Sequence, residues 1–399
     1  MSESTQKLLI KQEGIPIGLF VPPPNHEITT ERYREIKDAG FTFVLGLTEY
    51  DGGTAHIHRA LAAAHDNGLQ YLVCDPRLVA LPANELDKVG PYVTEFSSHP
   101  AYAGHLFMDE PNIAQFGKLR DLKAVYQEAA PQGLAYVNLF PTYASNEQLG
   151  GEYDEYVRLF MEQFKPDILS YDHYPFIDLR PDRELTITKD YYENLGIIRE
   201  AVLRSKVPFW LFIQTLSYNE WSRDPLEAEI RWQVYTSLAF GAKGIQYFTY
   251  WTPEDGNETF CPGMIDRSGN KTRHYDEVQT LNREIAPLGE VLIHLTSIGV
   301  LSHGKVSPPI EGGLTEFAPI LRIEGDPAVI GCFHDADDNA YALVVNESFQ
   351  ESCSLNIWLR KSEEPVSVWE NGQKTVLHPE QGSLALELRP GEGKLVSFS

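Results

Sequence analysis

The chain shows two different patterns of apolar and polar positions, one over most of its length and one near its C-terminal end. Over most of its length, short runs that are apolar throughout alternate with stretches that have the apolar spacing of amphipathic helices. The expected strands are 15–21, 41–47, 69–74, 103–108, 134–139, 168–171, 209–213 and 245–250. The expected helices between them include 30–39, 56–67, 115–129, 154–164, 191–204 and 225–240.

Strands that are apolar on both faces, each followed by a helix, predict a parallel sheet that helices cover on both sides. Eight such units are the number that closes a (β/α)₈ TIM barrel. An open, doubly wound sheet is the competing architecture, and it would carry a glycine-rich phosphate loop after its first strand. Here the first strand leads into Val21-Pro22-Pro23-Pro24. We therefore expect an α/β fold with a closed barrel.

The pattern changes after the last expected helix, at about 275–295. Short segments with strand-like alternation take over, and turn signals such as Asn371-Gly372 separate them. These segments are 328–333, 341–345, 354–359, 366–369, 384–388 and 394–398. They predict a small antiparallel β-sandwich. We expect a tail over 1–12, a catalytic barrel over 13–298 and the sandwich over 299–399.

Composition and charge narrow the function classes. A hydrophobic share of 42% in 399 residues is ample for a packed core. The formal net charge of −24 argues against a nucleic-acid partner, which would need clustered Lys and Arg. The N-terminus lacks the apolar region of a secretory signal, and no 18-residue apolar run exists, so we expect a cytoplasmic protein without a membrane segment. The oligomeric state is open.

Functional groups of a TIM barrel collect where its strands end, on the loops that lead into the helices. Carboxylates, amides and aromatic rings dominate these strand ends here. They include Asp75, Arg77, Asp109, Glu110, Asn138, Asp172, His173, Tyr174, Gln214 and Trp251. This composition is typical of a sugar site, since polar groups bond hydroxyls and rings stack on the apolar faces of pyranosides.

The strongest local signal is Met108-Asp109-Glu110-Pro111, at the end of the fourth strand. Adjacent acids on a strand point to opposite sides, so one of them can face the mouth of the barrel. A partly desolvated carboxyl beside a second negative group has a raised pKa and suits general-acid catalysis near neutral pH. The alternative is that the motif only caps the next helix, with Asp109 or Asn112 as N-cap.

The barrel with its strand-four acid, its strand-eight Trp251 and its trailing sandwich resembles the clan of retaining glycosidases that includes β-galactosidases and β-glucanases. It is most similar to bacterial branches with a D-E-P motif on strand four. The resemblance implies a glycoside hydrolase of O-glycosyl bonds that needs no cofactor. It also implies that Glu110 is the acid/base and that Trp251 lines the sugar subsite.

Gln214 departs from the pattern of this clan, whose nucleophile is a Glu at the end of strand seven. The nucleophile could have moved to Asp172 or to Glu220. The enzyme could instead be inverting, with Asp172 as base, or Gln214 could be an engineered Glu→Gln substitution. Strands four and six are not neighbours, which favours the wider carboxyl spacing of inverting enzymes, roughly 6.5–9.5 Å, over the 5–5.5 Å of retaining ones. We expect a catalytic Asp172.

Other residues of the rim are candidates for contact with a carbohydrate substrate: Asp109, Asn138, His173, Tyr174, Trp221, Trp251 and Arg77. Asn138 and Gln214 suit hydroxyl groups, and Tyr174 could stack on a sugar or orient the nucleophile. Arg77 beside Asp75 could bind a carboxylate substituent or form an internal salt bridge. Trp221 is either an aromatic platform or packed against the next helix.

Two further functions remain open from the sequence. A metal-dependent barrel enzyme, such as a sugar isomerase or amidohydrolase, would need a ligand set. The His56/His58 pair lies at the start of a helical segment, and no third ligand with regular spacing completes it, so we expect no metal and no cofactor. A carbohydrate-binding barrel that has lost its nucleophile is the second alternative, because of Gln214.

Overall fold

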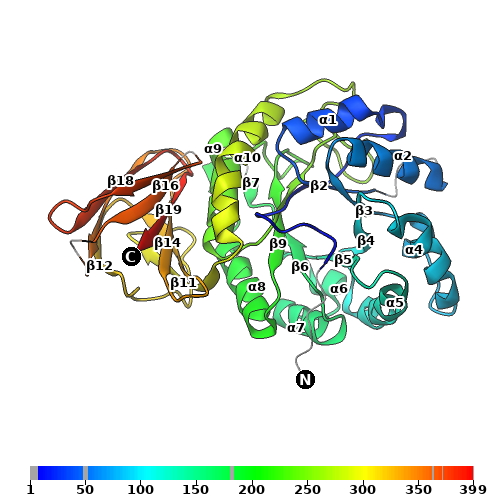
Figure 1. Cartoon of the computed structure of the whole chain (residues 1–399), viewed down its shortest axis with the longest axis horizontal. Coiled ribbons are helices and arrows are strands. Elements are labelled where there is room, and N and C mark those ends of the chain that lie inside the picture. Colours follow the sequence, from blue (N-terminus) through cyan, green and yellow to red (C-terminus); the bar gives the residue numbers. More distant parts are fainter. Residues whose placement is uncertain (1–7, 48–52, 180–183, 362–363, 371, 399) are drawn as a thin grey trace.

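The structure is a computed structural model that describes residues 8–47, 53–179, 184–361, 364–370 and 372–398. It consists of a closed barrel of eight parallel strands, as predicted, with an antiparallel β-domain beside it (Figure 1). The order around the barrel is β1-β10-β9-β6-β5-β4-β3-β2, and the pairing of Leu19 with Tyr247 closes the ring.

All eight predicted apolar runs coincide with barrel strands. The strands are β1 (Ile17–Leu19), β2 (Phe43–Leu45), β3 (Gln70–Val73), β4 (Tyr102–Asp109), β5 (Leu134–Leu139), β6 (Leu169–Asp172), β9 (Phe209–Gln214) and β10 (Ile245–Phe248). Their inward side chains form the barrel interior with Trp210, Phe212 and Tyr136, and the described N-terminal segment adds Ile10 to this cluster. Side chains from several strands thus fill the barrel, as in other barrels of eight strands.

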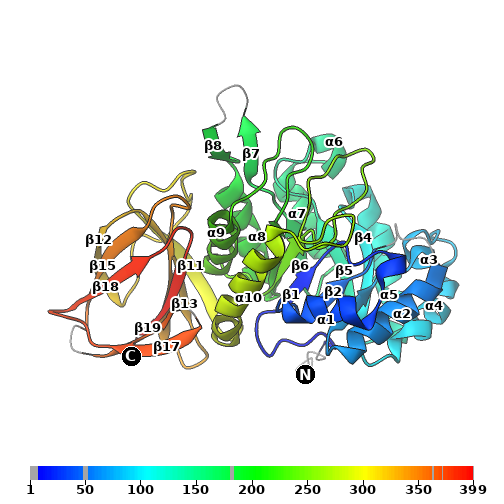
Figure 2. The ribbon, with the colours of Figure 1, turned by 90° about the horizontal axis from the view of Figure 1, so that it is seen from above.

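Helices surround the strands. They are α1 (Thr30–Asp38), α2 (Gly53–Asp66), α3 (Pro76–Val79), α4 (Val89–Ser97), α5 (Phe116–Ala129), α6 (Asn146–Leu149), α7 (Tyr153–Gln163), α8 (Tyr191–Ser205), α9 (Glu227–Ala239) and α10 (Arg273–Leu292). Three 3₁₀ turns, η1 (Asn25–Glu27), η2 (Leu86–Lys88) and η3 (Ile113–Gln115), complete the loops. A hairpin of β7 (Phe176–Leu179) and β8 (Glu184–Ile187) follows strand six and projects from the barrel (Figure 2).

The C-terminal domain consists of a six-stranded and a three-stranded antiparallel sheet. The larger sheet contains β11 (Thr296–His303), β13 (Ala328–His334), β14 (Ala340–Asn346), β19 (Gly393–Phe398), β16 (Val366–Glu370) and β17 (Gln373–Leu377). The smaller contains β12 (Ile320–Gly325), β15 (Cys353–Leu359) and β18 (Ser383–Leu388). Apolar side chains between the two sheets form a second core, as in a sandwich.

The sandwich packs against α9, which is buried along nearly its whole length (Figure 1). At Gly331 the backbone of β13 lies so close to α9 that a Cβ would stand 2.2 Å from the carbonyl oxygen of Ala239. Phe349 adds an edge-to-face contact with Trp232 of α9, with ring centroids 5.7 Å apart. This interface explains why α9 lacks an amphipathic pattern: barrel and sandwich cover opposite faces of it.

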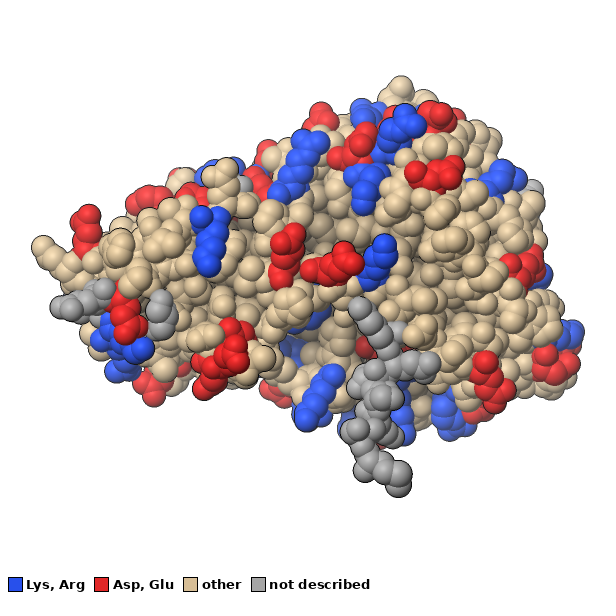
Figure 3. Space-filling model, viewed as in Figure 1, with Lys and Arg blue, Asp and Glu red and all other residues tan. Residues whose placement is uncertain are grey.

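On the face shown in Figure 3, acidic and basic side chains are intermixed. Among the described residues, no helix has the length and apolarity that a membrane crossing requires.

Candidate active site

A cavity of about 380 Å³ opens at the end of the barrel where the strands terminate. Its lining combines acidic groups with aromatic rings. The residues are Phe20, Asp109, Glu110, Asn138, Phe140, Pro141, Tyr143, Ala144, Gln148, Asp172, Tyr174, Phe212, Tyr218, Trp221, Phe248 and Glu258. The structure therefore brings six of the predicted site residues together here: Asp109, Glu110, Asn138, Asp172, Tyr174 and Trp221.

Glu110 follows β4 directly and has a left-handed backbone, with a φ of +48°. Such a conformation costs a residue with a side chain of order 1 kcal/mol and is found most often at functional sites. The N-cap at Asn112 that was the alternative interpretation is present, but it does not involve Glu110. The side chain of Asn112 accepts from Ala114 N at 2.9 Å, and Gln115 Oε1 accepts from Asn112 N at 2.7 Å. The side chain of Glu110 lines the cavity.

Asn138 at the end of β5 links the acids on the strands to either side. Its Nδ2 donates to Asp172 Oδ1 at 2.8 Å and to Asp109 Oδ1 at 3.1 Å. Ser170 Oγ donates to Asn138 Oδ1 at 2.9 Å, which fixes the orientation of the amide. Asp172, only 6% exposed, is therefore held from below the mouth by a hydrogen-bond network inside the barrel.

Glu110 and Asp172 form a direct side-chain hydrogen bond. The expectation of a wide spacing between the carboxyls of strands four and six is therefore wrong. Only β5 separates the two strands, and the longer side chain of Glu110 spans that gap. Two carboxyl groups in hydrogen-bond contact are closer to the spacing of a retaining pair than to that of an inverting pair.

The environment gives the two carboxyls different protonation. Burial and the negative charges of Asp172 and Asp109 raise the pKa of Glu110. Burial and Asp109 also raise the pKa of Asp172, but hydrogen bonds from Asn138 and Glu110 oppose the rise. Glu110 therefore holds its proton more tightly than Asp172 does. Two carboxyl groups whose environments set their pKa values apart can act as an acid and a base or nucleophile.

The structure places Gln214 outside the cavity lining. It lies fully buried at the end of β9, where the following loop covers it. Glu220, the other residue considered as a relocated nucleophile, is exposed and likewise does not line the cavity.

Three predicted contact residues also lie away from the cavity. Buried His173 bonds Asn194 Oδ1 at 2.8 Å through Nδ1 and Thr188 Oγ1 at 2.6 Å through Nε2. Trp251 is 5% exposed, and the guanidinium of Arg32 lies 5.5 Å from its ring centroid.

Arg77 forms the internal salt bridge that was the alternative to substrate binding. Its Nη2 lies 2.7 Å from Asp75 Oδ2 and 2.8 Å from Glu95 Oε2.

Sequence reasoning missed several rings and one acid of the lining, notably Tyr143, Tyr218, Phe248 and Glu258. Tyr174 stacks on Phe248 with a centroid distance of 5.1 Å, and Tyr218 meets Tyr174 edge-on at 5.7 Å. Tyr143 and Tyr218 follow predicted strand ends, Phe248 lies within the last predicted strand, and Glu258 lies on the loop beyond it. The only signal for the rings was the number of aromatic residues in these segments. Their convergence depends on loop conformation, which local patterns do not encode.

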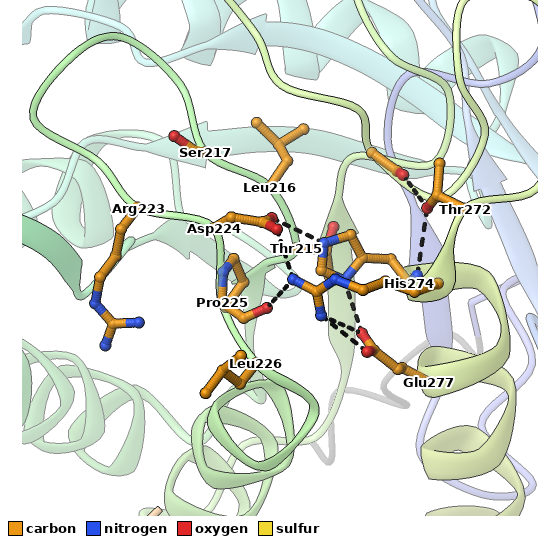
Figure 4. Close-up of polar contacts among 12 residues, drawn as sticks. Thr215, Leu216, Ser217, Arg223, Asp224, Pro225, Leu226, Thr272, His274 and Glu277 are labelled. Atoms are coloured by element: carbon orange, nitrogen blue, oxygen red, sulfur yellow. Dashed lines mark hydrogen bonds and ion pairs between the residues drawn. The ribbon is translucent and has the colours of Figure 1, made fainter. Parts of the chain in front are cut away.

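Residues 215–226, here called the aromatic arm, connect β9 to α9 and carry Tyr218 and Trp221 to the cavity. The two rings meet edge-on at 4.9 Å. Far from the cavity, Asp224 anchors the arm to α10 (Figure 4). Its Oδ1 lies 2.8 Å from His274 Nε2, and its Oδ2 lies 2.5 Å from Arg273 Nη2. Glu277 contacts the other side of His274, with Nδ1 and Oε2 2.9 Å apart.

This anchor predicts a pH-dependent contribution to stability. Burial alone would lower the pKa of His274, but its hydrogen bonds to Asp224 and Glu277 raise it above the ordinary value. A raised pKa stabilises the fold fully below the unfolded value of about 6.5, and the effect is lost as the pH rises through the folded pKa. We expect Asp224→Asn to lower the melting temperature most at pH 6 and less at alkaline pH. Thermal unfolding across pH tests this, with Glu254→Gln, a change at an 89% exposed side chain, as control. A difference that does not vary with pH would contradict it.

Comparisons with known proteins find the same barrel fold among glycosidases. A family model described as "Beta-galactosidase", of glycoside hydrolase family 42, matches residues 153–288, which include Asp172, Gln214 and Trp251. A catalytic mutant of a family 42 β-galactosidase from G. stearothermophilus superposes with a TM-score of 0.65 at 9% identity, covering 98% of this chain and 99% of that one. These findings support the retaining-glycosidase clan of (β/α)₈ barrels.

Further structures share the glycosidase barrel. A glycoside hydrolase family 5 protein from Bacteroides vulgatus matches with a TM-score of 0.60 at 11% identity, over 98% of this chain and 93% of that one. The β-galactosidase from the psychrophilic Marinomonas ef1 matches with a TM-score of 0.55 at 12% identity, over 71% of this chain. The chain spans only 62% of that enzyme's length. A search of curated proteins finds no match. The matched stretch and the fold are thus similar to those of glycoside hydrolases.

Proposed function

We propose that the chain hydrolyses glycosides by double displacement, with Glu110 as acid/base and Asp172 as nucleophile. The carboxylate of Asp172 attacks the anomeric carbon while Glu110 gives its proton to the departing oxygen. A covalent glycosyl ester on Asp172 results. Glu110 then takes a proton from water, the water oxygen attacks the anomeric carbon, and Asp172 leaves. The observation that carries the proposal is the side-chain hydrogen bond between the half-buried Glu110 and the buried Asp172 at the mouth of the barrel.

The lining supports a carbohydrate without acidic substituents as the substrate. Tyr174, Phe248 and Trp221 offer ring faces and edges to a pyranose, and Asn138 offers an amide beside the acids. The part of the lining that the structure describes contains no Lys, Arg or His, so an anionic substituent would be desolvated without a partner. β-Galactosides are the first substrates to test, because the matched family model describes β-galactosidases.

A panel of 4-nitrophenyl glycosides and short oligosaccharides tests the function. We expect the wild-type protein to release nitrophenol or sugar from at least one neutral glycoside, and Glu254→Gln, outside the cavity, to behave alike. We expect no comparable turnover of uronides. A correctly folded protein that binds sugars yet hydrolyses no member of a broad panel would contradict the proposal.

Loss of activity with a chelator would favour a metal-dependent enzyme instead. The described residues contain no group of three or more His, Cys, Asp or Glu that could hold a metal ion.

The pH profile tests the role of Glu110 separately. The acid must be protonated, so kcat/KM falls as the pH rises through the pKa of Glu110 in the free enzyme. Asp109 is one of the charges that raise this pKa. Asp109→Asn removes the charge, so the alkaline limb of the profile should move to lower pH, whatever the change in maximal rate. A limb that stays in place or moves up would exclude Glu110 as the group that titrates.

A further inference from the structure

The environment of Gln214 fits an amide and not a carboxylate. Its Oε1 accepts from the backbone N–H of Phe176 at 3.0 Å, which fixes the orientation of the amide group. Its Nε2 donates to Ser222 Oγ at 3.0 Å, Arg223 O at 3.1 Å and Leu216 O at 3.2 Å. An ionised Glu has no proton to donate, so it would place a buried negative oxygen against two backbone carbonyls. An amide is therefore the residue that this position requires.

The partners of Gln214 lie on the aromatic arm. Leu216, Ser222 and Arg223 lie on either side of the turn that carries Tyr218 and Trp221. The turn is closed on itself as well, because Ser217 Oγ donates to Ser222 O at 2.9 Å. Gln214 thus bonds the segments before and after the turn, at Leu216 and at Ser222 and Arg223.

The arm in turn supports the far wall of the cavity. Cys261 N donates to Ser217 O at 2.9 Å, and Asn219 N donates to Thr259 O at 2.8 Å. Asn219 Nδ2 also donates to Glu258 Oε1 at 3.1 Å. A displacement of the turn would therefore move Tyr218, Trp221 and Glu258 together, and all three line the cavity.

We propose that Gln214 is a positioning residue, which holds the aromatic arm so that Tyr218 and Trp221 face the sugar next to Asp172. It takes no part in bond making or breaking. The position at the end of strand seven serves as a structural anchor for the substrate wall. The catalytic part of this inference rests on the proposed function, whereas the anchoring of the arm does not.

Hydrogen exchange tests the anchoring without any substrate. We expect Gln214→Met, similar in volume but without the hydrogen bonds, to speed amide exchange in 216–223 by about tenfold or more. The matched control is Asn282→Leu, which removes a buried amide that bonds Tyr247 OH at 2.9 Å and Ala39 O at 2.8 Å and makes neither of these bonds to the aromatic arm. It should leave exchange in 216–223 unchanged. If Gln214→Met does not fold, Ser222→Ala should give a smaller change of the same sign. Equal exchange in wild type and variant would overturn the proposal.

A double-mutant cycle tests the positioning role in catalysis. We expect Gln214→Met to lower kcat/KM about tenfold in the wild-type background, but less than about threefold once Tyr218 and Trp221 are both alanine, because the effect passes through those rings. Additive losses would overturn the role. Gln214→Glu should likewise lower activity, and a gain would show that position 214 is a nucleophile site. If the wild-type protein hydrolyses nothing, the proposed function fails, and hydrogen exchange still decides whether Gln214 anchors the arm.

Discussion

Asp172→Ala is expected to lower kcat by a factor on the order of 10⁴, the largest effect of any single substitution in this chain. In the proposed mechanism Asp172 supplies the electron pair that replaces the leaving group. Asn138 would lose one hydrogen-bond acceptor but keep Asp109 and Ser170 as partners, so the barrel should remain folded. Steady-state kinetics on the best glycoside of the panel measure the loss.

Azide distinguishes a missing nucleophile from a damaged site. Azide fits the space that the Asp172 side chain leaves and attacks the anomeric carbon, while Glu110 still protonates the leaving oxygen. We expect recovery of turnover and a glycosyl azide of inverted anomeric configuration. An azide product of retained configuration would mean that Asp172 is the acid/base instead.

Glu110→Gln is expected to lower kcat roughly 10²- to 10⁴-fold on glycosides with poor leaving groups, the range that general-acid catalysis contributes. The amide retains the size of the side chain and a hydrogen-bond donor for Asp172, so the loss reports the missing proton. A leaving group that is stable as an anion needs little protonation. The loss should therefore shrink when 2,4-dinitrophenyl replaces 4-nitrophenyl as the leaving group. An equal loss on both substrates would contradict the acid role.

The same substitution has an opposite effect on stability. Burial and nearby charges raise the pKa of Glu110, so the folded state is stabilised at low pH, and this contribution is lost as the pH rises through the folded pKa. Glu110→Gln removes the desolvation cost of an ionised carboxylate at this position. It should therefore raise the melting temperature relative to wild type at alkaline pH. An active-site acid commonly shows this exchange of stability for function.

Sequence patterns predicted the architecture more fully than the site. The barrel strands are buried on both faces and read as unbroken apolar runs, and the acid of β4 follows such a run directly. The β7–β8 hairpin, β11, β12 and β17 were not predicted. In β12, Leu321 is 57% exposed and the strand has no regular buried face, so its pattern carried little information.

The contact between Glu110 and Asp172 could not be predicted from strand order alone. It depends on the left-handed backbone at Glu110 and on the network through Asn138, both of which are tertiary features. Trp251 and Arg77 illustrate the converse. Both lie at strand ends as site residues do, but Trp251 packs beneath Arg32 and Arg77 pairs with two carboxylates. Position at the rim selects candidates, and side-chain partners decide among them.

Covalent trapping tests the catalytic pair most directly. A 2-deoxy-2-fluoro glycoside with a dinitrophenolate leaving group slows both steps of a double displacement, yet allows the first to proceed, so the glycosyl enzyme accumulates. Using the glycone that the panel identifies, peptide mass spectrometry of the inactivated protein locates the label. We predict one sugar per chain, attached to Asp172, and no label in Asp172→Ala. A label on another carboxylate, such as Glu220 or Glu258, would contradict the account.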